Sequence, residues 1–220
     1  MARIIADISV SLDGFVTGPD AGPDNGLGTG GEPIHAWAFS DDPDDARIMR
    51  EATARSGAVV LGRHLFDVVD APLGWNDDVG YGAREAGRPA FFVVTRRPPE
   101  SVRLSELDWT FVTTGLADAI DAARQHTEAA AAARHQDLDV FLMGGGALIR
   151  SALAAGLVDS LCLHLSPVIV GAGTPLFTSG PPASLVQRSV VVTSTATHLT
   201  YDVLRERTAE TPSPDADRPR

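Results

Sequence analysis

Short apolar runs, each stopped by a polar or glycine-containing turn, recur along the chain and predict buried strands. Most of these runs are continuously apolar, as in strands that are covered on both faces of a parallel sheet. The last two alternate around a threonine-rich turn, which predicts an antiparallel hairpin at the C-terminal edge. The predicted strands are residues 3–10, 58–61, 90–95, 109–113, 139–143, 158–170, 189–194 and 198–205.

Helix signals lie between several of these strands. Acidic residues and Pro43 begin a helix after Ser40 that should end near Ser56, because acids favour the positive end of the helix dipole and proline is tolerated in the first turn. An alanine-rich segment, residues 116–133, and residues 147–155 are also predicted helices. The order predicts a single α/β domain over residues 1–206, with a mainly parallel sheet.

Two segments lack such periodicity. Gly, Pro, Asp and Asn dominate residues 17–31, and long loops in compact domains are often functional, so we expect a lid within residues 17–40. Residues 207–220 carry three prolines and almost nothing apolar, which predicts a disordered tail.

Composition narrows the possible partners. The chain has 220 residues and a formal net charge of -11, so its long-range field should repel nucleic acid and anionic membranes. Any bound phosphate must therefore be met by local arginines and backbone amides. Cys162 is the only cysteine, and we find neither an export signal nor a run of about 18 apolar residues. These features predict a cytoplasmic protein that binds a small molecule.

The strand-to-helix junction at Gly144, Gly145 and Gly146 is the strongest local signal. Glycines let a backbone approach a ligand closely, and the free amides of a helix start suit a phosphate group. The alternative is a tight turn without a ligand. Three consecutive glycines exceed what a turn needs, which favours phosphate binding.

Arginines follow two other predicted strands. Thr95 and Arg96 follow one strand, and Gly62 and Arg63 follow another. Arginine can grip a phosphate with two hydrogen bonds, as recognition of the 2′-phosphate of NADP requires. Each group alone also fits a solvated turn. Because strand ends on one side of a parallel sheet converge, the three signals together predict one nucleotide site.

Motifs of other enzyme classes are missing. No G-x-G-x-x-G follows the first strand, and the chain has no P-loop, H-E-x-x-H or G-x-S-x-G. The six histidines are scattered, so we assign no metal. An ordinary Rossmann dehydrogenase, an ATPase, a zinc hydrolase and a serine hydrolase are all disfavoured.

With these pieces in place, the chain resembles the RibD C-terminal-domain family within the dihydrofolate reductase-like superfamily. The resemblance rests on ISVSLDGFV, VVLGRHLFD, FFVVTRR and FLMGGGALIRSALAAGLVDSLCLHLSPVIVGAGTPLF. It implies a three-layer α/β/α fold and an NADPH-dependent reductase that is a homodimer. It also implies the cofactor contacts Gly62, Arg63, Thr95, Arg96, Gly144, Gly145, Gly146, Ala147 and Leu148.

Two positions depart from the pyrimidine reductases of this family. Met143 stands where those reductases carry an acidic residue before the glycines, and Asp7 stands where they carry a lysine. The chain is therefore more similar to the stand-alone reductase branch of the family.

The substrate side is less defined. Asp13 is expected to contact the substrate or to fix the turn that contains it. Trp37 and His35 would stack on a flat heterocycle, or Trp37 would be buried in the core. Four aspartates crowd the helix start, where a folate reductase places its pterin-binding carboxylate and where capping explains them equally well: Asp41, Asp42, Asp44 and Asp45.

Three functions remain open from the sequence. The first is hydride transfer from NADPH to a small heterocycle, with Asp13, Asp7 or solvent as the proton donor. The others are a pterin reductase of the dihydrofolate reductase type and a non-catalytic nucleotide-binding module.

Overall fold

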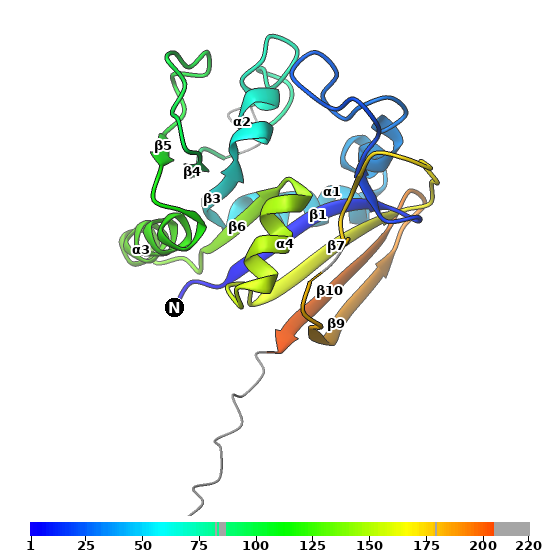
Figure 1. Cartoon of the computed structure of the whole chain (residues 1–220). Helices are drawn as coiled ribbons and strands as arrows, with labels where there is room; N and C mark the ends of the chain where they lie inside the picture. The colour runs from blue at the N-terminus through cyan, green and yellow to red at the C-terminus, as the bar shows by residue number, and fades with distance from the viewer. Residues whose placement is uncertain (82, 84–86, 179, 205–220) are drawn as a thin grey trace, which may run out of the picture.

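One eight-stranded sheet carries the fold of the computed structural model, which describes residues 1–81, 83, 87–178 and 180–204 (Figure 1). Its order is β5-β4-β3-β6-β1-β7-β10-β9. The pairs from β5 to β7 are parallel, whereas β10 pairs antiparallel with β7 and β9. The strands are β1 (Ile4–Ser11), β3 (Ser56–Gly62), β4 (Ala90–Val94), β5 (Trp109–Val112), β6 (Asp139–Gly144), β7 (Ser160–Ser166), β9 (Ser184–Val192) and β10 (Thr197–Leu204).

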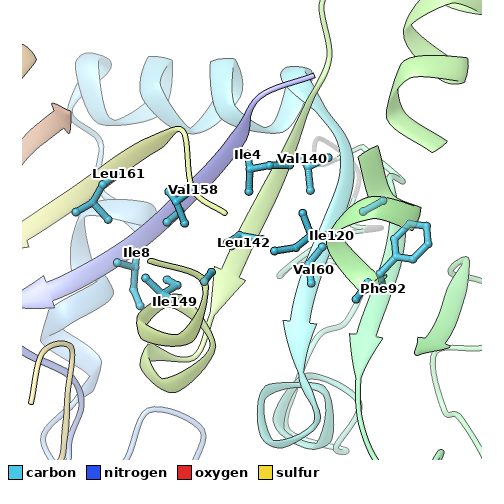
Figure 2. Packing of buried hydrophobic residues seen from close by; sticks show 14 of the residues in the cluster. Ile4, Ile8, Val60, Phe92, Ile120, Val140, Leu142, Ile149, Val158 and Leu161 are labelled. Atoms are coloured by element: carbon cyan, nitrogen blue, oxygen red, sulfur yellow. The ribbon is translucent and has the colours of Figure 1, made fainter. Parts of the chain in front are cut away.

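Helices cover both faces of this sheet. Helices α3 (Leu116–Arg134) and α4 (Gly146–Ala154) pack on one face, and α1 (Pro43–Arg55) and α2 (Arg63–Val69) belong to the other (Figure 1). Alternation along β1 explains the two cores, because Ile4 and Ile8 join the cluster under α3 and α4, whereas Ile5 joins the cluster that contains Phe66 of α2. Figure 2 shows the first cluster, in which Val60 and Leu142 meet Ile120 and Ile149.

The predicted mainly parallel sheet, its C-terminal hairpin and the α/β class are confirmed. The strand predicted over residues 158–170 is shorter, because Pro167 directly follows β7, which ends at Ser166. Strand β9 begins at Ser184, five residues earlier than we predicted, since its register with β10 continues through positions that carry no clear alternation.

Some elements escaped prediction. Helix α2 has seven residues, and its N-cap is Gly62, which has no side chain to cap it, so the usual start signal is missing. Strands β2 (Phe15–Thr17) and β8 (Thr174–Pro175) are very short and are fixed only by pairing with each other.

The expected lid at residues 17–40 is only partly irregular. Its second part is a 3₁₀ helix, η1 (Glu32–Phe39), and its first part is braced internally. Gly18 N–H donates to the Leu27 carbonyl at 2.8 Å, and Thr29 N–H donates to the Pro19 carbonyl at 2.8 Å. The tail predicted at residues 207–220 lies outside the described residues.

Candidate cofactor and substrate site

The carboxyl ends of three neighbouring parallel strands, β4, β3 and β6, meet at one edge of the sheet. Their register places Gly62 opposite Val94 and Leu61 opposite Gly144. The three segments that the sequence analysis combined into one nucleotide site therefore do lie side by side, as parallel strand ends should.

Each glycine of the turn between β6 and α4 has a different environment. Gly144 has a φ of +113°, which side-chain-bearing residues rarely adopt, and its peptide bond to Gly145 is cis. A Cβ on Gly146 would lie 3.3 Å from the Pro175 carbonyl oxygen. Gly145 is exposed, and a Cβ there would meet nothing within 4 Å. The surface above Gly145 is therefore open to an approaching group.

Helix α4 starts at this open surface. Its first intrahelical bond in the turn runs from Leu148 N–H to the Gly145 carbonyl at 3.0 Å. The amides of Gly146 and Ala147 precede that bond and so have no partner within the helix. Two backbone donors and the positive end of the helix dipole thus adjoin the bare glycine, as an anion site requires.

The arginines beside this turn differ in how far they are engaged. Arg63 donates through Nε to Asp67 at 2.7 Å and through Nη1 to the Arg97 carbonyl at 2.5 Å, which ties α2 to the turn after β4. The Thr95 hydroxyl also donates to the Arg97 carbonyl, at 2.9 Å. Arg96 is exposed, and among the described residues its side chain makes no hydrogen bond or ion pair. The side chain of Arg97, also exposed, likewise makes no hydrogen bond or ion pair among these residues, so Arg96 and Arg97 are both free cations of this turn, which Arg63 positions.

An open depression of about 450 Å³ adjoins Arg63. This volume is within the range of small-molecule sites. Its lining comes from α2, from the lid and from the segment after β4: Pro23, Arg63, Phe66, Asp67, Asp70, Ala71, Pro72, Pro99, Glu100 and Ser101.

Asp13 joins two loops through hydrogen bonds to its carboxylate. Its carboxylate accepts hydrogen bonds from the Ser11 hydroxyl at 2.6 Å and from the amides of Val170 and Gly171 at 3.1 and 2.7 Å. The bond from Ser11 is the largest cause of a lowered pKa of Asp13. With both oxygens engaged, the carboxylate fixes the β1–β2 turn against the segment after β7, and a substrate role remains a prediction.

Trp37 and His35 of η1, which were both expected to stack on a substrate, have different environments. The Trp37 ring is 5% exposed, lies 4.1 Å from the His164 ring centroid, and donates through Nε1 to Ser9 at 2.8 Å. This placement matches the alternative of a buried tryptophan. His35 is half-buried, its Nδ1 is buried without a partner, and burial lowers its pKa to about 4.

The aspartates at the start of α1 also differ in their partners and in their burial. Asp42 is the N-cap and accepts from the Asp44 amide at 3.0 Å, while Asp44 pairs with Arg47. Asp45 is different, because its side chain is fully buried. Asp42 therefore caps the helix, Asp44 forms a surface ion pair, and the Asp45 carboxylate has no surface exposed to a ligand.

Asp45 belongs to a polar chain that sequence reasoning did not assemble. Its Oδ1 lies 2.7 Å from His198 Nε2, His198 Nδ1 lies 2.7 Å from His164 Nδ1, and His164 Nε2 lies 3.1 Å from Asp7 Oδ1. The chain crosses from α1 over β10 and β7 to β1. The available signal was a histidine in each of two apolar strands, but their partner strands could not be identified from sequence.

The geometry defines a class first: this is an α/β protein with the dihydrofolate reductase-like fold. A putative riboflavin biosynthesis protein from Shewanella sp. PV-4 has a similar structure, with a TM-score of 0.64 and 22% identity over 93% of this chain and 100% of that one. A pyrimidine reductase-like protein from Corynebacterium diphtheriae gives a TM-score of 0.57 and 18% identity over 93% of each chain. Acinetobacter baumannii RibD gives 0.62 and 17%, over 93% of this chain and 59% of that one.

The sequence comparisons then identify the family. Residues 2–201 match the RibD C-terminal domain, and the chain belongs to that family. The uncharacterized protein YyaP of Bacillus subtilis (strain 168) is 23% identical over 180 residues, which cover 80% of each chain. The resemblance inferred from the four sequence blocks is thereby confirmed.

Two further properties concern the described residues. No helix among them is both long and apolar enough to span a bilayer. Within the same part of the chain, no group of three or more His, Cys, Asp or Glu side chains could hold a metal ion.

Proposed function

We propose that the chain is an NADPH-dependent reductase of a small heterocyclic compound, similar to 5-amino-6-(5-phosphoribosylamino)uracil reductase. The observation that carries this proposal is the open backbone at Gly145 and the start of α4, on the same edge of the sheet as the exposed Arg96, which follows β4 two strands away. Membership of the RibD C-terminal domain family supports the reductase class.

The residues present fit a dinucleotide phosphate. The amides of Gly146 and Ala147 would hold the pyrophosphate at the start of α4, and Arg96 would pair with the 2′-phosphate. Arg63 would keep the turn after β4 in place through the Arg97 carbonyl. The depression beside Arg63 would take the nucleoside at that end.

NADPH would supply a hydride from C4 of its nicotinamide. The protein's own work is to hold the heterocycle against that carbon and to exclude water, which lowers the barrier through proximity and desolvation. Within the expected lid, the Gly- and Pro-rich segment of residues 17–31 would close over such a ligand, because its Pro23 lines the depression beside Arg63.

Arg96 provides the test. Arg96→Ala should weaken NADPH binding roughly tenfold or more and leave NADH binding almost unchanged, because only NADPH carries the phosphate that a charged hydrogen bond would hold. Nicotinamide fluorescence during titration with each nucleotide measures both affinities. The matched control is Arg134→Ala, which removes an exposed arginine at the C-terminal end of α3.

Two results would contradict the proposal. Failure of the wild-type chain to bind either nucleotide would remove the reductase function. Tight NADPH binding without turnover of 5-amino-6-(5-phosphoribosylamino)uracil, dihydrofolate or a screen of related heterocycles would instead favour a non-catalytic nucleotide-binding module.

A homodimer is part of the same proposal. Among the described residues, strand β9 pairs only with β10, which leaves one edge of that sheet open, and Leu185, Val190 and Val192 in it are 41%, 44% and 72% exposed. Long edge strands with exposed apolar residues favour association. Sedimentation velocity of the purified chain should give twice the monomer mass, and a single monomeric species would rule the dimer out.

A further inference from the structure

The polar chain of Asp45, His198, His164 and Asp7 is separate from the cofactor edge, the sheet edge at the ends of β4, β3 and β6 where the cofactor is proposed to bind. The geometry of its contacts restricts how many protons it can hold. It contains two contacts between a ring nitrogen and a carboxylate oxygen, of 2.7 and 3.1 Å, and one contact of 2.7 Å between the two imidazole rings. Ring nitrogens without hydrogen and ionised carboxylates are both acceptors only. Each contact therefore needs a proton to be a hydrogen bond.

Three hydrogen bonds require three protons. Two neutral imidazoles and two carboxylates carry only two. With only two protons, one contact is left as a pair of acceptors: either His164 Nδ1 and His198 Nδ1 at 2.7 Å, or His164 Nε2 and the Asp7 carboxylate at 3.1 Å. Either pair of acceptors is costly. The geometry thus favours one additional proton in the chain.

The Asp45 end is fixed. Burial raises the pKa of the Asp45 carboxyl, but hydrogen bonds from Ser40, Thr195 and His198 outweigh that effect and hold the pKa at about 2. As an ionised acceptor, Asp45 takes its hydrogen bond from His198 Nε2–H. Burial lowers the pKa of His198, which keeps that ring neutral and leaves its Nδ1 as an acceptor. His164 must then donate from Nδ1.

This assignment places the additional proton in the contact between His164 Nε2 and Asp7 Oδ1. It resides on His164 as an imidazolium beside an Asp7 carboxylate, or on Asp7 as a carboxyl group beside a neutral ring. The side chain of Asp7 is 26% exposed, whereas those of His164, His198 and Asp45 are 5%, 6% and 0% exposed. Among these four side chains, Asp7 is the one that solvent or a ligand can reach.

The ionisable groups around this end are neutral near pH 7. Burial raises the pKa values of Tyr81 and Cys162, which interact electrostatically with Asp7, to about 12. Burial lowers the pKa of His35, which lies near His164, to about 4. No neighbouring group therefore competes for the additional proton over a wide range of pH.

Asp7 also lies close to the cofactor edge. Ala6 pairs with Leu142, and Gly144 follows two residues later in β6. At about 3.3 Å per residue, Asp7 is roughly one residue rise below the glycine turn, on the face that η1 partly covers. A flat ligand that reached the sheet end there would contact Asp7.

We propose that Asp7, His164, His198 and Asp45 form a buried proton store that opens through Asp7 and donates the proton that accompanies hydride transfer. This use of the store rests on the proposed reductase function. The hydride adds to the carbon of a C=N or C=O bond, the π electrons move to nitrogen or oxygen, and that atom takes the Asp7 proton. Asp7 is then the catalytic acid, the other three are positioning residues, and water reloads Asp7 after product leaves.

Nitrogen-15 NMR of histidine-labelled protein tests the store without cofactor or substrate. Near pH 7, His164 should carry hydrogen on Nδ1, and His198 should carry it on Nε2 only. The additional proton should appear as a second hydrogen on His164, at Nε2, or as a protonated Asp7 carboxyl group in carbon-13 spectra. Single-histidine variants assign the signals.

Asp7→Asn sharpens the measurement. It removes the carboxylate that shares the additional proton, so His164 should keep its hydrogen on Nδ1 and have none on Nε2. The matched control Asp13→Asn removes a carboxylate from the β1–β2 turn and should leave the His164 signals as they are in the wild type. His164 with a bare Nδ1 near pH 7, or a wild-type protein with neither a second hydrogen on His164 nor a protonated Asp7, would overturn the store.

The two proposals can fail separately. Loss of nucleotide binding in the fluorescence titration would remove the reductase while leaving the NMR result intact. A reductase that binds NADPH but shows a two-proton histidine pair would keep its cofactor site and lose the proton store.

Discussion

The cofactor edge and the buried polar chain are assembled in opposite ways. At the cofactor edge, each group lies next to the strand that positions it, as Gly144 does at the end of β6 and Arg96 does just after β4. In the polar chain, Asp7, Asp45, His164 and His198 come from four separate elements, and contact pairs are separated by up to 157 residues. The first region is built from local turns and the second from tertiary packing.

This difference decides how each region should respond to substitution. The cofactor edge is exposed and has space above it, so changes there should alter binding and leave the fold intact. Asp45, His164 and His198 of the polar chain are buried and paired, so removal of one of them leaves its partners without hydrogen bonds. The two regions can therefore be separated by comparing stability with nucleotide affinity in matched variants.

The largest expected effect is on stability, at Asp45. Asp45→Ala leaves the donors on Ser40, Thr195 and His198 without their acceptor, and should lower the free energy of unfolding by about 3 kcal/mol or more. Urea denaturation at pH 7 measures it. Asp44→Ala, one residue away but exposed and paired only with Arg47, should change stability by no more than about 0.5 kcal/mol.

Acid should weaken the same contact in the wild-type chain. The pKa of Asp45 is about 2 in the folded protein against 3.8 in the unfolded one, so its contribution is present above about pH 4 and is lost as the pH falls towards 2. The shift corresponds to roughly 2 kcal/mol. Asp45→Asn should lose this part of the acid dependence. Equal effects of the Asp44 and Asp45 alanine variants at pH 7 would show that the polar chain is not a structural unit.

The sequence predicted what depends on neighbours along the chain. Continuous apolar runs located the parallel strands, and glycine and arginine after three of them predicted a nucleotide site whose three strand ends the order β4-β3-β6 does bring together. The sequence could not predict α2, whose N-cap, Gly62, offers no capping side chain. Nor could it separate Asp45 from Asp42, since an aspartate at a helix start can cap the helix or turn inward, and only packing decides between them.

The polar chain was beyond prediction for a related reason. His164 and His198 face each other because β7 and β10 pair antiparallel in a register that places the two residues directly opposite. A shift of one residue would place either side chain on the other face of the sheet. Sequence patterns specify that these segments are strands, but the register is set by the packing of the whole hairpin.

A smaller effect, on affinity alone, is expected at the cofactor edge. Gly145 has an ordinary negative φ of -68°, is exposed, and has no heavy atom within 4 Å of the position that a Cβ would take. Gly145→Asp should therefore change the free energy of unfolding by less than about 0.5 kcal/mol. It places a carboxylate where the pyrophosphate would bind, so NADPH affinity should fall about a hundredfold through charge repulsion and blocked amides.

The control is Ala155→Asp, the same charge at the far end of α4, which should leave affinity unchanged. Nicotinamide fluorescence and urea denaturation on the same preparations decide the matter. A Gly145→Asp protein that binds NADPH normally would mean that the bare glycine is only a turn, and the cofactor site would then have to lie elsewhere than at the three strand ends.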